Sequence, residues 1–312
     1  MFDDPRWSDD PRHRDDTGPG LSRGGGASRD PVDTRERDQG SDPRDVFTQD
    51  LRLPRGPERE IVWDRNRHYT LRGSETRTLA TVGSFRVVSA HDLRDHNGHP
   101  LDLRQGDLRP LCEEGLVRTV PLEGRKDVAV VLTDRGRDLL NGHRVERSHD
   151  SQERHQTFYA ELKKPREVEH DAQLYSAYVR EAERLQERGA RIERAVLDYE
   201  LKQEYQRFLQ ERNTGRSDSD GRPDRTAAEI EDWARAHDLP YFDEQVHFPD
   251  VRIEYEEPDG RWSHEDIELV TVHYRGAHAA GAARSGFTCR GASSGRTGGR
   301  SFDPDLAREF LG

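Results

Sequence analysis

The sequence predicts a mixed α+β or α/β protein in which a disordered arm precedes two folded domains. Three observations lead to this prediction: the composition of residues 1–60, a series of helix and strand patterns over residues 74–142, and two strand patterns joined by a turn within residues 251–272. The predicted parts are a disordered arm at 1–60, a first domain at 61–142, a linker at 143–156, an α/β domain at 157–290 and a mobile tail with a short terminal helix at 291–312.

Composition separates the arm from the rest of the chain. Of the 312 residues, 31% are hydrophobic and 36% are charged, and the formal net charge is -12. Residues 1–60 are dominated by Asp, Arg, Gly, Pro and Ser, and their few apolar side chains cannot bury enough surface to offset the entropy of ordering. The acidic net charge argues against a generally basic, nucleic-acid-coating protein, but it leaves room for a local basic surface.

Several classes of protein are excluded by simple patterns. Cys112 and Cys289 lack the CxxC spacing of a zinc site and are too few for a disulfide framework. No apolar run approaches the roughly 18 residues of a membrane span. The opening residues MFDDPRWSDD lack the basic and apolar regions of a secretory signal. We therefore expect a cytoplasmic protein without a membrane partner.

The first domain shows start and stop signals for helices followed by a hairpin pattern. Ser74 and Ser89 are suitable N-caps, and Gly115 is a suitable C-terminal stop. The predicted order is a helix from Ser74, a second helix from Ser89, a third helix over 103–114, a strand at 116–120, a polar hairpin tip at 122–127, a strand at 128–132 and a last helix at 135–140.

This order is that of a winged helix-turn-helix module. Two steps of the sequence resemble MarR-like winged-helix regulators: Gly115-Leu116-Val117-Arg118 after the third helix, and Leu132-Thr133-Asp134-Arg135-Gly136 after the hairpin. The resemblance covers roughly a fifth of the chain. It implies binding of double-stranded DNA, while a winged helix used for protein contacts or dimerisation remains the alternative.

A recognition helix of this kind enters the major groove, where outward Arg and Gln side chains reach base edges or phosphates. Pro110 within the predicted helix removes a backbone donor and shortens it. Asp107, Glu113 and Glu114 are expected to dilute the positive field there. The candidate DNA-binding residues are Arg104, Gln105 and Arg109 on the third helix, Arg125 and Lys126 at the wing tip, and Arg94, with Arg77 and Arg86, as backbone contacts.

The second domain alternates helix and strand patterns. Its strongest local signal is the capping box that starts with Thr226 and ends with Glu229. The predicted elements are a helix over 157–188, a strand at 191–198, a helix around Tyr205, a helix after Thr226, strands at 251–255 and 266–272, and a helix near 273–282.

Two carboxylates of this domain have the positions of a nuclease motif. Asp250 follows Pro249 at the start of one predicted strand, and Glu268 lies within the next strand, on the same face as Val270. The pattern resembles PD-(D/E)xK nucleases, in which such carboxylates hold a divalent metal and a nearby lysine helps to position water. Val270 occupies the lysine position, so we expect little or no hydrolysis. A turn aspartate and an exposed hairpin glutamate are the alternative interpretation of these two residues.

Together the two domains resemble the replication-relaxation family of mobile elements, which joins a winged helix to a degenerate nuclease-like domain. The resemblance implies a role in replication, mobilisation or regulation of a mobile element. The leading hypothesis is therefore a double-stranded DNA-binding protein without a cofactor, with a homodimer as a further possibility. Two alternatives stay open: a nuclease that uses Asp250 and Glu268 with Mg²⁺ or Mn²⁺, and a protein-interaction adaptor that dimerises through the winged helix.

Overall fold

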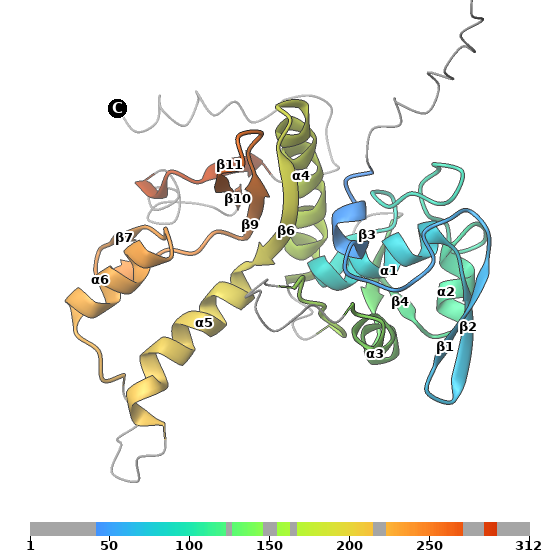
Figure 1. The fold of residues 1–312 in the computed structure, drawn as a ribbon, viewed down its shortest axis with the longest axis horizontal. Helices are drawn as coiled ribbons and strands as arrows, with labels where there is room; N and C mark the ends of the chain where they lie inside the picture. The colour runs from blue at the N-terminus through green and yellow to red at the C-terminus, as the bar shows by residue number, and fades with distance from the viewer. Residues whose placement is uncertain are drawn as a thin grey trace, which may run out of the picture. The chain divides into compact units, whose positions relative to one another are not determined.

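The computed structural model describes residues 42–122, 127–145, 155–162, 167–214, 223–270 and 284–291. All of these residues belong to one of the two units into which the chain divides, Ser41–Gly312. This unit is a mixed α+β structure of helices and several sheets (Figure 1). Within its described residues, no helix is both long and apolar enough to cross a membrane.

Residues 42–60 are folded, so the predicted disordered arm is wrong over this part. A short 3-10 helix, η2 (Asp45–Thr48), buries Phe47 to 2% exposure. The Phe47 ring lies 5.5 Å from that of Phe85 and 5.3 Å from that of Tyr178. The segment needs no core of its own because Phe47, Leu51 and Leu53 join the core of the rest of the unit. Residues 1–41 of the predicted arm lie outside the described residues.

The next part of the chain forms a β-hairpin and then a small sheet flanked by helices. The hairpin pairs β1 (Glu60–Asp64) with β2 (Arg67–Leu71). In the small sheet all neighbours are antiparallel and the strand order is β3-β5-β4. The elements of this part are α1 (Gly73–Phe85), β3 (Val87–Ser89), α2 (Leu108–Glu113), β4 (Val117–Pro121), β5 (Val128–Leu132) and α3 (Asp134–Gly142).

The predicted second helix, which was to begin at Ser89, is absent from this described segment. Val87–Ser89 is instead the strand β3, and all three residues are buried opposite β5. The two β-branched valines before Ser89 pack well on a pleated surface. Ser89 is therefore part of a strand and does not cap a helix. Turns, bends and two isolated β-bridges occupy residues 90–107. The short sequence signal for a helix was therefore overridden by pairing with a distant strand.

The third helix is shorter than predicted: α2 has six residues and begins at Leu108. Pro110 is the third residue of α2, where a backbone N–H would have no partner within the helix. The proline therefore fits the first turn of the helix, and it does not interrupt it. Gly115 follows with a φ of +68°, a conformation that glycine adopts without steric cost, and the chain turns there into β4.

Gly136 explains one of the two sequence steps quoted above. Thr133 caps α3 by accepting a hydrogen bond from the Gly136 N–H at 3.1 Å. A Cβ atom on Gly136 would lie 2.3 Å from the carbonyl oxygen of Leu116 and 2.6 Å from a methyl carbon of Leu132. A glycine is needed here because the backbone of α3 touches the turn that leads into β4.

Gly136→Ala is expected to lower the free energy of unfolding by about 2–3 kcal/mol, because the backbone around Leu116 must move to admit a methyl group. Urea unfolding measures the effect. Gly56→Ala is the matched control, since a Cβ atom at Gly56 meets nothing within 4 Å. Equal stability of the two variants would contradict the close approach of α3 to β4.

The larger sheet has the order β11-β10-β9-β6. Its β6–β9 and β9–β10 pairs are antiparallel, whereas β10 and β11 are parallel. Strand β11 was not predicted, and the helix expected near 273–282 lies outside the described residues, as do 292–312. The elements are α4 (Val168–Glu187), β6 (Arg191–Leu197), α5 (Asp198–Gln210), η4 (Glu211–Asn213), α6 (Ala227–Ala236), β7 (Tyr241–Phe242), β8 (Gln245–Val246), β9 (Val251–Glu256), β10 (Trp262–Val270) and β11 (Thr288–Gly291).

The helix predicted over 157–188 begins only at Val168. Before it, residues 155–162 form no helix or strand, and their backbone forms hydrogen bonds with the first half of the chain. The Tyr159 N–H donates to the carbonyl of Gly83 at 2.7 Å, and the Glu161 N–H donates to that of Leu132 at 2.9 Å. These long-range bonds replace the local bonds that a helix would need.

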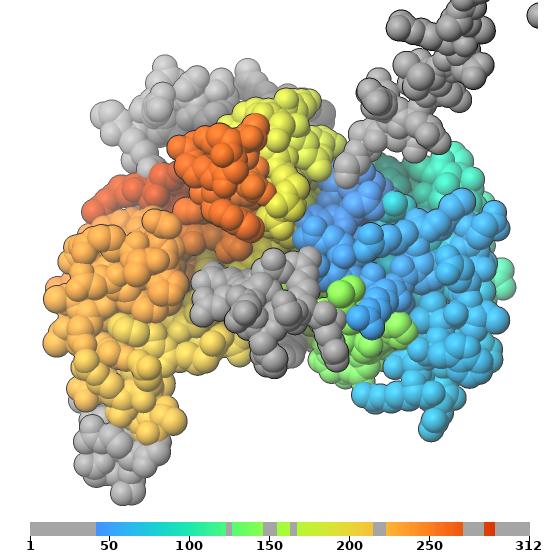
Figure 2. Space-filling model, viewed as in Figure 1, coloured from blue at the N-terminus to red at the C-terminus, as the bar shows by residue number. Residues whose placement is uncertain are grey.

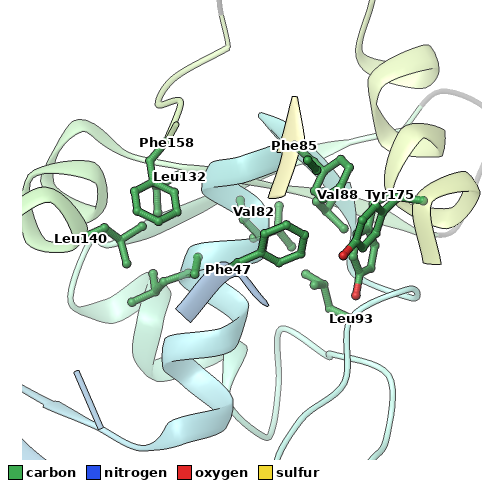
Figure 3. Close-up of a cluster of buried hydrophobic side chains, with 14 of the residues drawn as sticks. Phe47, Val82, Phe85, Val88, Leu93, Leu132, Leu140, Phe158 and Tyr175 are labelled. Carbon is green, nitrogen blue, oxygen red and sulfur yellow. The ribbon is translucent and has the colours of Figure 1, made fainter. Parts of the chain in front are cut away.

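One hydrophobic core joins the helices of the first half to α4 and the larger sheet. Figure 3 shows side chains from η2, α1, β3, β5, α3 and α4 gathered in one cluster, among them Phe85 and Tyr175. These two rings lie 5.3 Å apart and come from α1 and α4. The predicted linker at 143–156 is fixed at both described ends: Arg144 forms a β-bridge with Leu51, and Gln156 donates to the carbonyl of Ala195 at 2.9 Å.

Candidate functional site

The candidate DNA-binding residues lie on the turns before α2 and on α2 itself. Arg104 and Gln105 are exposed in these turns. Arg109 is exposed on α2, and its Nε atom donates to Glu113 Oε1 at 2.7 Å. Arg94 is also exposed, and its guanidinium donates to the carbonyls of His91 and Leu93. Arg125 and Lys126, at the expected wing tip, lie outside the described residues.

Asp107 fixes these turns to the start of α1. Its side chain is fully buried. Its Oδ2 atom accepts hydrogen bonds from Ser74 Oγ at 2.6 Å and from the His96 N–H at 2.9 Å, and its Oδ1 atom lies 2.8 Å from His96 Nδ1. The expectation that Asp107 dilutes a positive surface field is therefore wrong, because its charge is turned inward among donors.

Two of the expected phosphate-backbone contacts are engaged within the protein. Arg77 Nε lies 2.5 Å from Asp45 Oδ1, so it ties α1 to η2. The Arg86 guanidinium lies 2.8 Å from Asp171 on α4. These ion pairs connect separate parts of the fold. The exposed candidates in the described part are thus Arg94, Arg104, Gln105 and Arg109.

In the larger sheet, Asp250 lies beside the part of β10 that contains Glu268. The Asp250 N–H donates to the carbonyl of Ile267 at 3.0 Å, and Asp250 Oδ2 accepts from the Leu269 N–H at 2.8 Å. Asp250 is therefore bonded to both chain neighbours of Glu268. Ile267 and Leu269 are 0% and 2% exposed and face the core, so Glu268 and Val270 share the opposite face of β10.

His170 on α4 contacts Asp250, and the sequence did not predict this contact. Its Nε2 atom lies 3.4 Å from Asp250 Oδ2, and its Nδ1 atom lies 3.5 Å from Asp171 Oδ1. Burial lowers the pKa of His170, but the hydrogen bonds and charges of Asp171 and Asp250 outweigh it and raise the pKa to about 10. His170 is thus an imidazolium at neutral pH. The only signal in the sequence was its place in the helix that precedes the sheet.

The residues present do not fit the Mg²⁺ or Mn²⁺ ion of the nuclease hypothesis. The Asp250 carboxylate faces a backbone N–H and a cationic imidazole, whereas a metal-binding carboxylate must offer its oxygens to the ion. Val270 supplies no group to position water. Over the part of the chain that the structure describes, no three His, Cys, Asp or Glu residues are grouped so that they could hold a metal.

The stability of the protein is expected to fall as the pH rises from about 7 to 10, because His170 has a raised pKa in the folded state. Its contribution is fully present below the ordinary pKa of 6.5 and is lost as the pH passes about 10. The side chain is 31% exposed, so we expect about 1–2 kcal/mol once solvent screening is included. Melting temperatures of wild type and His170→Gln from pH 6 to 10.5 measure it. Parallel curves for the two proteins would contradict the imidazolium.

The chain matches no protein-family model, and no curated protein or solved structure matches it. The functional interpretation therefore rests on the residues and the two sheets described above. For the first half, these are the sequence steps at residues 115–118 and 132–136 and the β3-β5-β4 sheet. For the second half, they are the carboxylates of Asp250 and Glu268 and the mixed four-stranded sheet.

Proposed function

We propose that this protein binds double-stranded DNA through α2, the turns before it and the β4–β5 hairpin. The observation that carries the proposal is the arrangement of these elements: a short helix with an exposed arginine precedes a hairpin in a sheet of order β3-β5-β4. This order resembles that of a winged helix, in which the helix before the hairpin enters the major groove. The missing helix after Ser89 is the main departure from that pattern.

The dimensions of α2 define how it contacts DNA. A helix of six residues is about 9 Å long, so it spans only part of a major groove. Arg109 then reaches the DNA from the helix, and Arg104 and Gln105 reach it from the preceding turns. The exposed ion pair between Arg109 and Glu113 is worth little in water, so a phosphate or a base edge can replace the glutamate.

The α/β domain acts in this proposal as a non-catalytic scaffold. Its antiparallel β6–β9–β10 strands with a parallel fourth strand, preceded by α4, resemble the core of PD-(D/E)xK nucleases. His170 supplies a cation to Asp250, and Val270 replaces the lysine. The apolar core shared with α1 lets this domain hold the DNA-binding half in place. The resemblance suggests a cytoplasmic role in replication, mobilisation or regulation of a mobile element, with DNA and a second copy of the chain as partners.

The test is fluorescence anisotropy of the full-length protein with random duplex DNA at about 50 and 200 mM salt, because phosphate contacts impose a steep salt dependence. The double variant Arg104→Ala/Arg109→Ala is expected to bind about tenfold more weakly. Arg235→Ala is the matched control: Arg235 is 68% exposed on α6 and, like Arg109, forms an ion pair with the glutamate one helical turn away.

Salt-independent binding, or no binding at low salt, would contradict the proposal and favour the adaptor alternative. Equal losses in the double variant and in Arg235→Ala would mean that net charge, and not this surface, determines the affinity. The same samples with Mg²⁺ or Mn²⁺ test the nuclease alternative, since cleavage that disappears in Asp250→Ala would show a catalytic centre.

A further inference from the structure

The β1–β2 hairpin exposes an apolar face. Trp63 is 67% exposed and Ile61 is 64% exposed, and they neighbour each other on this face. The ring of His68, directly across from Trp63, lies 5.3 Å from the indole at an interplanar angle of 52°. Val62 and Tyr69, on the other face, are buried. The hairpin therefore packs one face on the core and presents the rings of Trp63 and His68 on the other. Figure 1 shows the position of β1 and β2 in the fold.

Trp63 and Ile61 border an open hollow of about 350 Å³. Figure 2 shows this part of the chain, in light blue, at the surface of the molecule. An exposed apolar surface of this kind marks an interaction site more often than an isolated exposed residue does. Besides apolar neighbours, the hollow is lined by three basic side chains and one carboxylate: Arg52, Arg55, His143 and Glu60.

The basic side of the hollow is held in place by hydrogen bonds. The Arg52 N–H donates to the carbonyl of His143 at 2.7 Å, and His143 Nδ1 lies 3.0 Å from the carbonyl of Leu139. The Nη2 atom of Arg55 donates to the carbonyls of Thr48 at 3.2 Å and Gln49 at 2.9 Å, which leaves the N–H groups of Nε and Nη1 for a ligand. Arg52 makes no ion pair within the described part of the chain, so its charge is available.

We propose that this hollow binds single-stranded DNA, with an unpaired base stacked on Trp63 and the adjoining phosphates on Arg52 and Arg55. Aromatic side chains beside a basic groove are the combination by which proteins bind single strands, because every base has a face that can stack. The bases of a duplex are covered by their own neighbours, so this contact selects an unpaired strand.

Two further exposed arginines, Arg65 and Arg67, extend the basic surface to the hairpin tip, and neither makes an ion pair within the described residues. A strand whose base lies on Trp63 could therefore continue past the tip. The choice of DNA over RNA rests on the proposed function. The single-strand site itself does not depend on α2.

The experiment is anisotropy of full-length protein with fluorescein-labelled oligo-dT of about 12 nucleotides at 50 and 200 mM salt. Trp63→Ala is expected to weaken binding at least about fivefold, while Trp63→Phe, which keeps a ring, loses less than about threefold. Trp262→Ala is the matched control: Trp262 is 63% exposed on β10, and its loss is expected to change the affinity less than about twofold. Arg52→Ala is expected to reduce the salt dependence.

Three results would overturn the proposal: no oligo-dT binding at 50 mM salt, equal affinities of Trp63→Ala and Trp262→Ala, or tighter binding of oligo-U RNA of the same length. Melting curves identify a variant that fails to fold. If Trp63→Ala does not fold, the oligo-dT affinity of Trp63→Phe tests the proposal. Duplex DNA in parallel separates the two proposals. If Arg104→Ala/Arg109→Ala weakens only duplex binding and Trp63→Ala only single-strand binding, both stand. If oligo-dT binding depends on Trp63 but the protein does not bind duplex DNA, the single-strand site is supported and the proposed duplex-binding function is contradicted.

Discussion

Arg252→Met is expected to lower the free energy of unfolding by about 3–5 kcal/mol, because it leaves a buried carboxylate without its partner. The Arg252 side chain is 8% exposed and that of Asp266 is 10% exposed. Two parallel hydrogen bonds join them, from Nε at 2.7 Å and from an Nη atom at 2.8 Å. The pair connects β9 with β10 in the middle of the larger sheet.

The same guanidinium also closes the end of α6. It donates to the carbonyls of His237 and Asp238 at 2.8 and 2.9 Å. Carbonyls at the end of a helix lack partners within the helix and carry the negative end of its dipole, so a cation there is stabilising. Methionine fills much of the volume of arginine but donates no hydrogen bond. The variant therefore destabilises both the larger sheet and the contact between α6 and this sheet.

Urea unfolding of Arg252→Met beside Arg191→Met provides the measurement. Arg191 is 65% exposed at the start of β6 and pairs with Glu256 on β9. An exposed pair contributes about 0–1 kcal/mol, so this control is expected to stay close to wild type. In the double variant Arg252→Met/Asp266→Leu the buried charge is gone, and part of the stability should return. Equal unfolding midpoints for the two methionine variants would contradict the structural role of Arg252.

The elements that local patterns specify were predictable from the sequence. The Thr226 capping box starts α6 as predicted, and both of its reciprocal hydrogen bonds are present. Strands β4, β5, β6 and β9 also lie close to where the strand patterns of the sequence placed them. In each case the signal and the structure involve the same few residues. The secondary structure of such segments can be predicted from the sequence because their local preferences agree with the final fold.

The errors occurred where distant residues determine the local structure. Phe47 lies in a polar segment, and its core partners Phe85 and Tyr178 are far along the chain. Ser89 has the properties of a helix cap, but β5 pairs with the strand that contains it. Composition and periodicity describe one segment at a time, so neither can indicate a partner segment.

The candidate site shows the same division. Asp250 and Glu268 were proposed as candidates because the β9–β10 hairpin that they adjoin is a local motif. His170 was missed because α4 reaches Asp250 only once the helix has packed on the sheet. Asp107 was expected to weaken a positive surface field, although Ser74 and His96 enclose its carboxylate in the folded protein. Burial of a charged side chain depends on partners that the sequence does not place.

Asp107→Ala is expected to lower the free energy of unfolding by about 2–4 kcal/mol, because several buried donors lose their acceptor together. Ser74 Oγ and the His96 N–H both point at Asp107 Oδ2, and the His96 ring lies against Oδ1. Alanine offers none of them an acceptor. Urea unfolding is the measurement, with Asp102→Ala as the control from the same turns. Asp102 is exposed, and its carboxylate accepts the Arg104 N–H at 2.8 Å, so about 0.5 kcal/mol is expected there.

The same substitution links the fold to the proposed function. Asp107 attaches the turns that carry Arg104 and Gln105 to the start of α1, and it is the residue immediately before α2. Without this attachment the turns must be ordered when DNA binds, which lowers affinity although no DNA-contacting side chain has been removed. We expect Asp107→Ala to bind duplex DNA several-fold more weakly, with faster hydrogen exchange over residues 94–107. If Asp107→Ala matches Asp102→Ala in both stability and affinity, the buried carboxylate does not organise this surface. If it is destabilised yet binds DNA as tightly as wild type, the duplex contacts lie elsewhere on the molecule.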